Sequence, residues 1–243
     1  MIPAQTMASS FQLKNGTGVE MISNEEQRQE ALTVLETIYC VEKHWVGAST
    51  TLFEPSELQD PHKQWLIAYD THRAVGVVRL SFNRQAHHFP TEYLHFQHAD
   101  WNAMVMANFL SHNPTAEIGR FAILPEYRSH SRFALMLMQM ACTQAILNHC
   151  FYILTDVFHG DLQSPFHFHT QILGFEPFAT YADERFNSHY PSILLIMDLR
   201  KTYLHTKKYQ PRIFRTFTQN WPPSLHLQLD TYRYESSPST FGS

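Results

Sequence analysis

One stretch, residues 116–134 (AEIGRFAILPEYRSHSRFA), constrains the fold more than any other part of the chain. It predicts a strand at 117–124, a turn at Pro125, and then a helix that Ser129 or Ser131 can cap. A loop between a strand and a helix N-terminus directs backbone N–H groups to one place, with the positive end of the helix dipole behind them. The sequence therefore predicts an anion-binding loop. Three side chains add charge to it: Arg128, His130 and Arg132.

This order of strand, Leu-Pro-Glu-Tyr-Arg, basic loop and long apolar helix resembles the acyl-donor motif of the GNAT N-acyltransferase superfamily. Arg128 fits that motif, whereas Ser131 and Phe133 stand where the superfamily has glycine. Because glycine lets the backbone approach a pyrophosphate closely, its replacement disfavours a tight coenzyme A cradle. A phosphopantetheine arm on a carrier protein carries one phosphodiester and asks less of the loop. The resemblance implies these donor-binding residues: Ala122, Ile123, Leu124, Arg128, Ser129, His130, Ser131, Arg132, Phe133 and Ala134.

The start of the same stretch, Glu117-Ile118-x-Arg120, resembles two GNAT-like families that take fatty acyl groups, commonly from acyl carrier protein. These are the acyl-homoserine-lactone synthases and the bacterial long-chain N-acyl amino acid synthases. Residues 39–45 resemble the Tyr…Glu…Trp ending of the first helix in the second family. The segment 181–191, which contains Tyr190, resembles the same family.

The periodicity of apolar residues predicts an alternation of helices and strands. In chain order these are a helix at 25–43, strands at 64–69, 74–81 and 117–124, a helix at 132–149, a strand at 151–158, a helix at 162–173 and a strand at 192–199. We expect an α/β (α+β) fold with a GNAT-like mixed central sheet flanked by helices. In GNAT proteins the two parallel strands, here 117–124 and 151–158, splay apart and admit the pantetheine arm.

The domain predicted from this pattern covers residues 23–200, between an N-terminal extension at 1–22 and a basic extension at 201–243 whose end is expected to be disordered. The basic extension lacks acidic residues until Asp230. A solvated tail is the favoured interpretation, and a dock for an acidic acyl carrier protein is the alternative. Its basic side chains are those of Arg200, Lys201, Lys207, Lys208, Arg212 and Arg215.

An insertion at 82–115 contains a short helix at 101–110, which Asp100 can cap. Flexible, Met-rich apolar surface suits an irregular fatty chain, so this helix is a candidate wall of an acyl pocket. The alternative, favoured for any single residue, is that the helix packs on the sheet. The candidate substrate-binding residues are Trp101, Met104, Met106 and Tyr190.

The reaction implied by the resemblance is attack of an amine on a fatty acyl thioester. Glu117 is the candidate base for the amine proton, and Asp156 and His159 are second choices. Arg120 can bind a substrate carboxylate as a bidentate fork, or form a salt bridge with Glu117. Backbone N–H groups at 122–124 are candidate donors to the thioester oxygen.

Composition excludes several other classes of function. A net charge of −4 does not favour nucleic acid. Charged residues make up only 16% of the chain, which suggests apolar surface reserved for a ligand or partner. The start of the chain does not resemble a signal peptide, and no apolar run reaches the roughly 18 residues of a membrane span. A cytoplasmic protein is the expectation.

The three cysteines show neither metal nor disulfide spacing. His167 and His169 lie two residues apart on a predicted helix and so point to different faces. We therefore expect no metal site and no tightly bound cofactor.

The sequence thus predicts an N-acyltransferase that moves a medium- or long-chain fatty acyl group from acyl carrier protein or acyl-CoA to an amine of an amino acid or peptide. Three alternatives stay open: a small-acyl acetyltransferase that uses acetyl-CoA, an acyl-homoserine-lactone synthase, and an inactive GNAT-like binding module.

Overall fold

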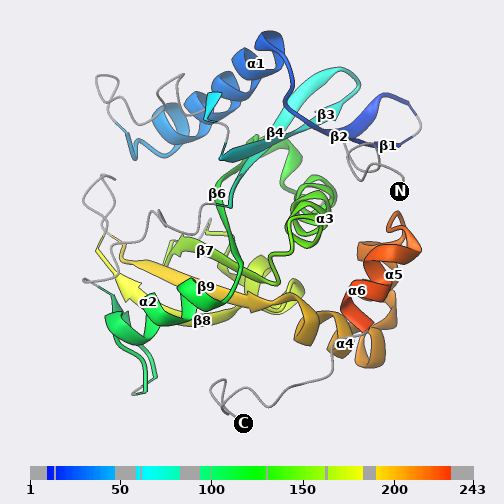
Figure 1. Cartoon of the computed structure of the whole chain (residues 1–243). Helices are drawn as coiled ribbons and strands as arrows, with labels where there is room; N and C mark the ends of the chain where they lie inside the picture. The colour runs from blue at the N-terminus through cyan, green and yellow to red at the C-terminus, as the bar shows by residue number, and fades with distance from the viewer. Residues whose placement is uncertain are drawn as a thin grey trace.

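The computed structural model describes residues 10–13, 15–46, 59–60, 62–82, 94–98, 100–129, 131–161, 164–182 and 190–230 (Figure 1). They form one nine-stranded sheet with helices on its faces. Across the sheet the strands are β1 (Ser10–Leu13), β2 (Thr17–Met21), β3 (Lys63–Asp70), β4 (Arg73–Ser81), β6 (Thr115–Ile123), β7 (Tyr152–Phe158), β9 (Ser192–Asp198), β8 (Glu176–Tyr181) and β5 (His95–Phe96). The β6–β7 pair is parallel and the other neighbouring pairs are antiparallel. This confirms the predicted mixed sheet.

The hairpin of β3 and β4 shows how local sequence sets the register. Its two-residue turn, Thr71 and His72, has positive φ at both positions, as the twist of a tight hairpin requires. Ala68 lies opposite Gly76, and Tyr69 lies opposite Ala74, so Val75 bulges between them. A glycine inside a strand often marks such a bulge or a close approach of another backbone. A Cβ atom there would lie 3.2 Å from the carbonyl oxygen of Ala122 on the next strand.

Two helices cover opposite faces of the central strands. Helix α1 (Glu25–Glu36) begins at Asn24, whose side chain accepts a hydrogen bond from the Gln27 N–H, and continues as a π-helical turn, Thr37–Glu42. Helix α3 (Arg132–Leu147) is buried along most of its length. Alternate residues of β3 separate the two cores: Leu66 packs in the core that includes α3, and Ile67 packs in the core that includes α1. The helices and the sheet thus form three layers (Figure 1).

The insertion helix α2 (Ala103–His112) packs on the half of the sheet that contains β8 and β9. Its N-cap is Asn102 rather than the predicted Asp100. Trp101 and Met106 are buried in a third core with Phe178, whereas Met104 is 76% exposed. Trp101 and Met106 thus pack in a core, as the packing alternative has it. A role of Trp101, Met104 and Met106 in an acyl pocket stays a prediction.

The basic C-terminal stretch is folded, not a solvated tail. It forms α4 (Leu199–Tyr209), α5 (Pro211–Thr218) and α6 (Pro223–Asp230). Tyr203 and Trp221 are buried in the same core as α3, which anchors these helices. Two of the basic side chains have acidic partners: Lys207 Nζ lies 2.7 Å from Asp230, and Lys201 Nζ lies 2.8 Å from Glu176. The helix predicted at 162–173 includes a π-helical turn, Phe168–Ile172, which carries His169. The other predicted elements differ from the observed ones by at most two residues at each end, and β1, β2, β5 and β8 were not predicted.

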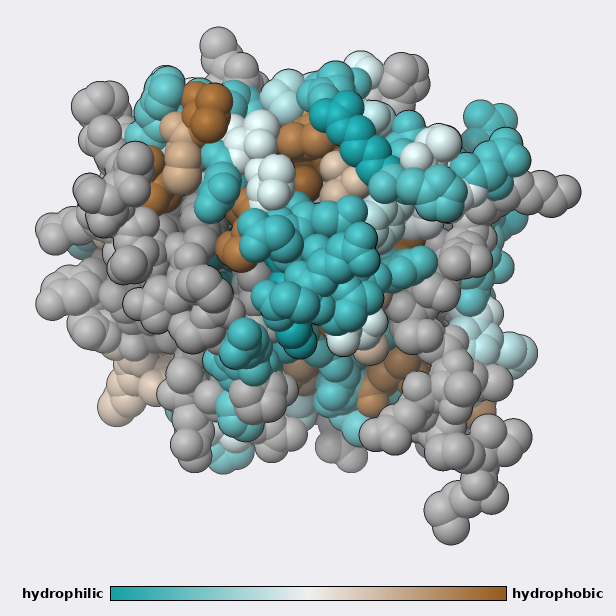
Figure 2. All heavy atoms as spheres, turned by 90° about the horizontal axis from the view of Figure 1, so that it is seen from above, coloured by the Kyte–Doolittle hydropathy of each residue, from teal (hydrophilic) through white to brown (hydrophobic). Residues whose placement is uncertain are grey.

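The described surface seen from above α1 is mostly hydrophilic (Figure 2). Hydrophobic residues on this face appear in small separate groups, so the low share of charged residues does not produce one large apolar patch in the described part of this face. Among the described helices, none combines the length and the hydrophobicity needed to cross a bilayer.

We expect Met106→Ala to lower the free energy of unfolding by about 2–5 kcal/mol, because it leaves a cavity under α2. Met104→Ala is the matched control, since its side chain is mostly exposed, and should change stability by less than about 0.5 kcal/mol. Urea denaturation measures both values. Equal losses in the two variants would contradict the described packing of α2.

Candidate active site

The site lies where β6 and β7 separate. The last residue pair in their parallel ladder is Ile118 opposite Thr155. Beyond it β6 continues to Ile123 alongside β4, and β7 continues to Phe158 alongside β9. This is the splay of the two parallel strands that the sequence predicted, and it leaves facing backbone edges open to a ligand.

A β-bulge in β6 turns side chains toward this gap. Gly119 lies opposite Arg79, and Ala122 lies opposite Val77, so Arg120 and Phe121 share one position of β4. Arg120 has a φ of 54°, a conformation that residues other than glycine adopt rarely. Bulges of this kind re-aim side chains next to active sites. Both Arg120 and Phe121 line the pocket in the gap.

The pocket has a volume of about 240 Å³ and is lined from several elements. Tyr39 and Trp45, after α1, close one side of it. The Trp45 ring lies 4.6 Å from that of Phe158 at the end of β7. Charged and titratable residues also line it: Lys63, Arg79, Glu117, Arg120, Asp156 and His169.

Glu117, the candidate base, lies in the wall of this pocket in a buried ion pair. Arg79 Nη2 donates to Glu117 Oε1 at 2.6 Å, and the two residues are 5% and 3% exposed. Gly119 leaves space for the guanidinium, since a Cβ atom at this position would lie 2.6 Å from Arg79 Nη2. Arg79 is thus an ion-pair partner of Glu117, and the salt bridge considered for Glu117 with Arg120 stays a prediction. Sequence reasoning missed Arg79, although an arginine inside the apolar run at 74–81 was a visible signal.

The alternative proton acceptors lie in different surroundings. Asp156 lines the pocket, and its Oδ2 accepts a hydrogen bond of 2.7 Å from the Tyr181 hydroxyl. His159 is exposed, lies outside the set of residues that line the pocket, and packs its ring against Phe166. Tyr190 is 46% exposed and lies over Gly160, just beyond β7, also outside the pocket wall.

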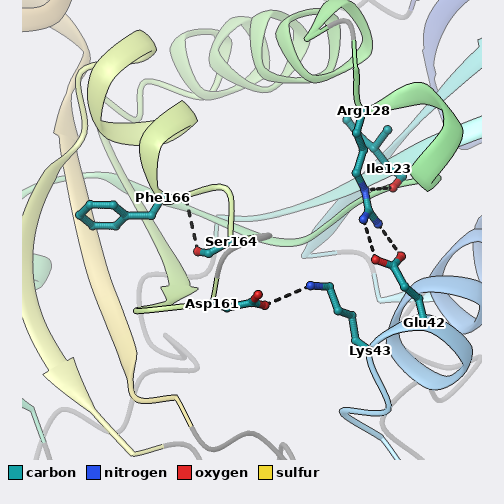
Figure 3. A network of polar contacts seen from close by, with 7 residues as sticks. All are labelled: Glu42, Lys43, Ile123, Arg128, Asp161, Ser164 and Phe166. Atoms are coloured by element: carbon teal, nitrogen blue, oxygen red, sulfur yellow. Dashed lines mark hydrogen bonds and ion pairs between the residues drawn. The ribbon is translucent and has the colours of Figure 1, made fainter.

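In the predicted donor loop, the side chain of Arg128 binds other protein groups. Arg128 Nη1 and Nη2 donate to the two carboxylate oxygens of Glu42 at 2.6 and 2.7 Å, and Nε donates to the carbonyl of Ile123 at 2.8 Å (Figure 3). Lys43, which follows Glu42 in the chain, forms an ion pair of 3.0 Å with Asp161, a residue after β7. The Arg128 guanidinium is therefore engaged by protein groups, and its expected role as a phosphate ligand stays a prediction.

Two of the predicted backbone donors are already used by the sheet. The Leu124 N–H donates to the carbonyl of Val75 at 2.9 Å, and Ala122, two residues earlier, points to the same side of β6. Ile123 lies between them, so its N–H is directed to the opposite edge, toward the gap. Of the residues at 122–124, Ile123 is thus the one placed to donate to a ligand.

The first backbone N–H groups of α3 lie at the N-terminus of a 16-residue helix. Ser131 is the N-cap, but its side chain makes no capping hydrogen bond. Phe133 is buried against Tyr127, with ring centroids 5.5 Å apart, and Ala134 is buried beside it. Phe133 therefore does not line the pocket. Ser129 and Arg132 are exposed, and His130 lies outside the described residues.

His169 is a pocket residue that the sequence did not single out as a ligand-binding group. It is fully buried, and burial lowers the pKa of its imidazole to about 3. Within the described residues, no three His, Cys, Asp or Glu side chains come together as a metal site.

The model of the N-acyl amino acid synthase FeeM family matches residues 38–198 of the chain, which include both splayed strands and the pocket. The chain belongs to this family. The crystal structure of FeeM from uncultured soil microbes superposes with a TM-score of 0.56 at 17% identity, covering 76% of this chain and 92% of FeeM. Among the curated proteins, none matches the chain.

Acetyltransferases share the fold of this FeeM-family chain. Aminoglycoside 6'-acetyltransferase type Ii gives a TM-score of 0.50 at 12% identity, covering 74% of this chain and 96% of the enzyme. Ribosomal-protein-S5-alanine acetyltransferase from Vibrio fischeri gives 0.50 at 14% identity, with coverages of 78% and 96%. The protein is thus an N-acyltransferase of the FeeM family, and it shares the fold of these acetyltransferases.

We expect Arg79→Met to lower the free energy of unfolding by about 3–5 kcal/mol, because it removes the guanidinium from the buried Glu117 carboxylate. Adding Glu117→Gln should restore part of the loss, since the buried charge is then gone. Arg73→Met is the control: its ion pair with Glu126 is exposed, and it should cost less than about 1 kcal/mol. Urea denaturation that gives equal losses for the single and double variants would contradict this account of the pair.

Arg128 and Glu42 should behave as one unit. We expect a double-mutant cycle of Arg128→Ala and Glu42→Ala, read by thermal unfolding, to give a coupling energy of about 0.5–3 kcal/mol. Additive effects would mean that the bidentate pair contributes little in solution. Ser129→Ala, in the same loop, is the control that should leave the cycle unchanged.

Proposed function

We propose that the protein transfers a medium- or long-chain fatty acyl group from a phosphopantetheine thioester to the amine of an amino acid or a peptide. The observation that supports this most is the pocket between β6 and β7, which joins a buried carboxylate, Glu117, to the cationic side chains of Arg120 and Lys63. A pantetheine arm is narrow enough to lie in such a gap. The FeeM family to which the chain belongs is one of N-acyl amino acid synthases.

The acceptor in this proposal is bound through its carboxylate and attacks through its amine. Arg120 and Lys63 provide positive charge in the pocket wall for the carboxylate. Glu117, directly or through water, takes the proton that the amine loses as its nitrogen bonds to the thioester carbon. Asp156, oriented by Tyr181, is the second candidate for that proton. The carbon–sulfur bond then breaks, the proton held by the base returns to the sulfur, directly or through water, and the arm leaves as its thiol.

The donor in this proposal enters from the start of α3. Its phosphate lies at the first N–H groups of that 16-residue helix, whose N-cap side chain leaves them uncapped. The Ile123 N–H faces the thioester oxygen. Phe133 is buried in the core at a position where glycine would leave the backbone bare, which favours an acyl carrier protein, with its single phosphodiester, over coenzyme A.

The test is a mass-spectrometric survey of products. Acyl carrier protein and coenzyme A thioesters of two to sixteen carbons are each offered with a set of amino acids and with lysine- and ornithine-containing peptides. We expect N-acylated products from the longer carrier-protein thioesters, and a rate about 10²–10⁴-fold lower for Glu117→Gln. Glu126→Gln, an exposed carboxylate, is the control. Turnover of acetyl-CoA alone would instead identify a small-acyl acetyltransferase.

A further inference from the structure

The imidazole of His169 is a buried polar group that the reaction as outlined does not use. It is 0% exposed and lines the pocket between the splayed strands. Within the described part of the chain, neither Nδ1 nor Nε2 has a hydrogen-bond partner. Native proteins rarely leave such groups unsatisfied, and those that do often keep them for a ligand.

The ring is held by aromatic neighbours rather than by polar ones. Its centroid lies 5.6 Å from the ring of Phe121, 5.6 Å from that of Phe168, and 5.2 Å from that of Phe175. Phe121 belongs to the bulge of β6, so His169 is fixed against the segment where the strands part. The orientation of the imidazole is therefore set by packing before any ligand arrives.

The position of His169 indicates which of the two substrates, the acyl donor or the amine acceptor, it contacts. Phe121, Phe168 and Phe175 pack with the core that includes α3, whereas Tyr39 and Trp45 pack with the core that includes α1. The pocket thus passes through the sheet between the two helical layers. His169 lies on the layer of α3, at whose start the proposed function has the donor phosphate bind.

The chemistry of the imidazole further limits which group of the donor can hydrogen-bond to it. Burial lowers its pKa to about 3, so the ring is neutral at physiological pH, with one N–H donor and one nitrogen acceptor. A neutral ring in an aromatic wall is poorly suited to a carboxylate or an ammonium group, which the charged side chains of the pocket serve better. It matches a secondary amide, which offers a carbonyl acceptor and an N–H donor, and the pantetheine arm contains two such amides.

We propose that His169 hydrogen-bonds an amide of the donor's pantetheine arm and so positions the thioester beside Glu117. This inference rests on the pantetheine donor of the proposed function, but not on the length of the acyl chain or the identity of the amine. In the absence of the arm the hydrogen-bonding capacity of the ring is unused, and binding of the arm satisfies it.

The test compares two donors that carry the same acyl group, one as its pantetheine thioester and one as its ethanethiol thioester, which has no amide. His169→Phe keeps the ring and removes its hydrogen bonds. We expect it to lower kcat/KM for the pantetheine thioester about tenfold and to leave the ethanethiol thioester within about twofold. His169→Gln, which can still donate and accept, should recover part of the loss.

Two controls separate binding from structure. His167→Phe replaces an exposed histidine of the same helical turn and should leave both donors unaffected. The urea midpoint of His169→Phe should be no lower than that of the parent protein, because the variant buries no unsatisfied polar atom. Equal losses with both donors, or a change confined to the KM of the amine, would overturn the inference.

A binding measurement separates this inference from the proposed function. Pantetheine without an acyl group is titrated into protein labelled with ¹⁵N-histidine, and the ring nitrogens of His169 should shift, with the signal assigned by its loss in His169→Phe. The shift persists even if the chain length or the amine acceptor has been assigned wrongly. Binding without the shift overturns the role of His169 while leaving the donor class intact, and no binding overturns both.

Discussion

The separation of β6 from β7 is the constraint around which the site is arranged. Beyond the Ile118–Thr155 pair, each strand has lost one hydrogen-bonded neighbour. In a folded protein such backbone groups need another partner, or a ligand that provides one. The bulge at Arg120 and Phe121 keeps the strands apart, because it places two side chains where a regular ladder would have one. The gap is thus maintained by the backbone conformation of the bulge and by the side chains packed at it.

Adjacent residues of opposite charge secure the two sides of this gap. Glu42 pairs with Arg128, after β6, and Lys43 pairs with Asp161, after β7 (Figure 3). Both come from the end of the π-helical turn that follows α1, so one short segment links two strand ends that do not pair with each other. The Lys43 and Asp161 side chains are 11% and 15% exposed, so this pair is shielded from salt more than a surface pair is. The first helix therefore helps to set the width of the site in addition to covering it.

The order of elements could be predicted because each follows from local patterns. The apolar periods of β3, β4, β6, β7, β9 and α3 appear within short windows, and Asn24 and Gly76 mark a cap and a bulge. The site was predicted only in part. Glu117 was found through its motif, whereas its ion-pair partner, Arg79, is 38 residues away along the chain. The partner of Arg128 is 86 residues away, so its guanidinium looked free for phosphate. No local pattern reports such pairings.

His169 illustrates a different limit of sequence reasoning. Its spacing from His167 on a helix was interpreted correctly as placing the two side chains in different surroundings, and the structure shows one exposed and one fully buried. What spacing does not reveal is that the buried one lies against the strand bulge, within a wall of phenylalanine rings. A phenylalanine would fit that wall without leaving any polar atom unsatisfied. Proteins that retain a locally unfavourable group generally do so at functional sites, where stability is exchanged for binding or chemistry. The pocket combines two such departures, a positive φ at Arg120 and an unpaired imidazole at His169, and both lie where the strands diverge.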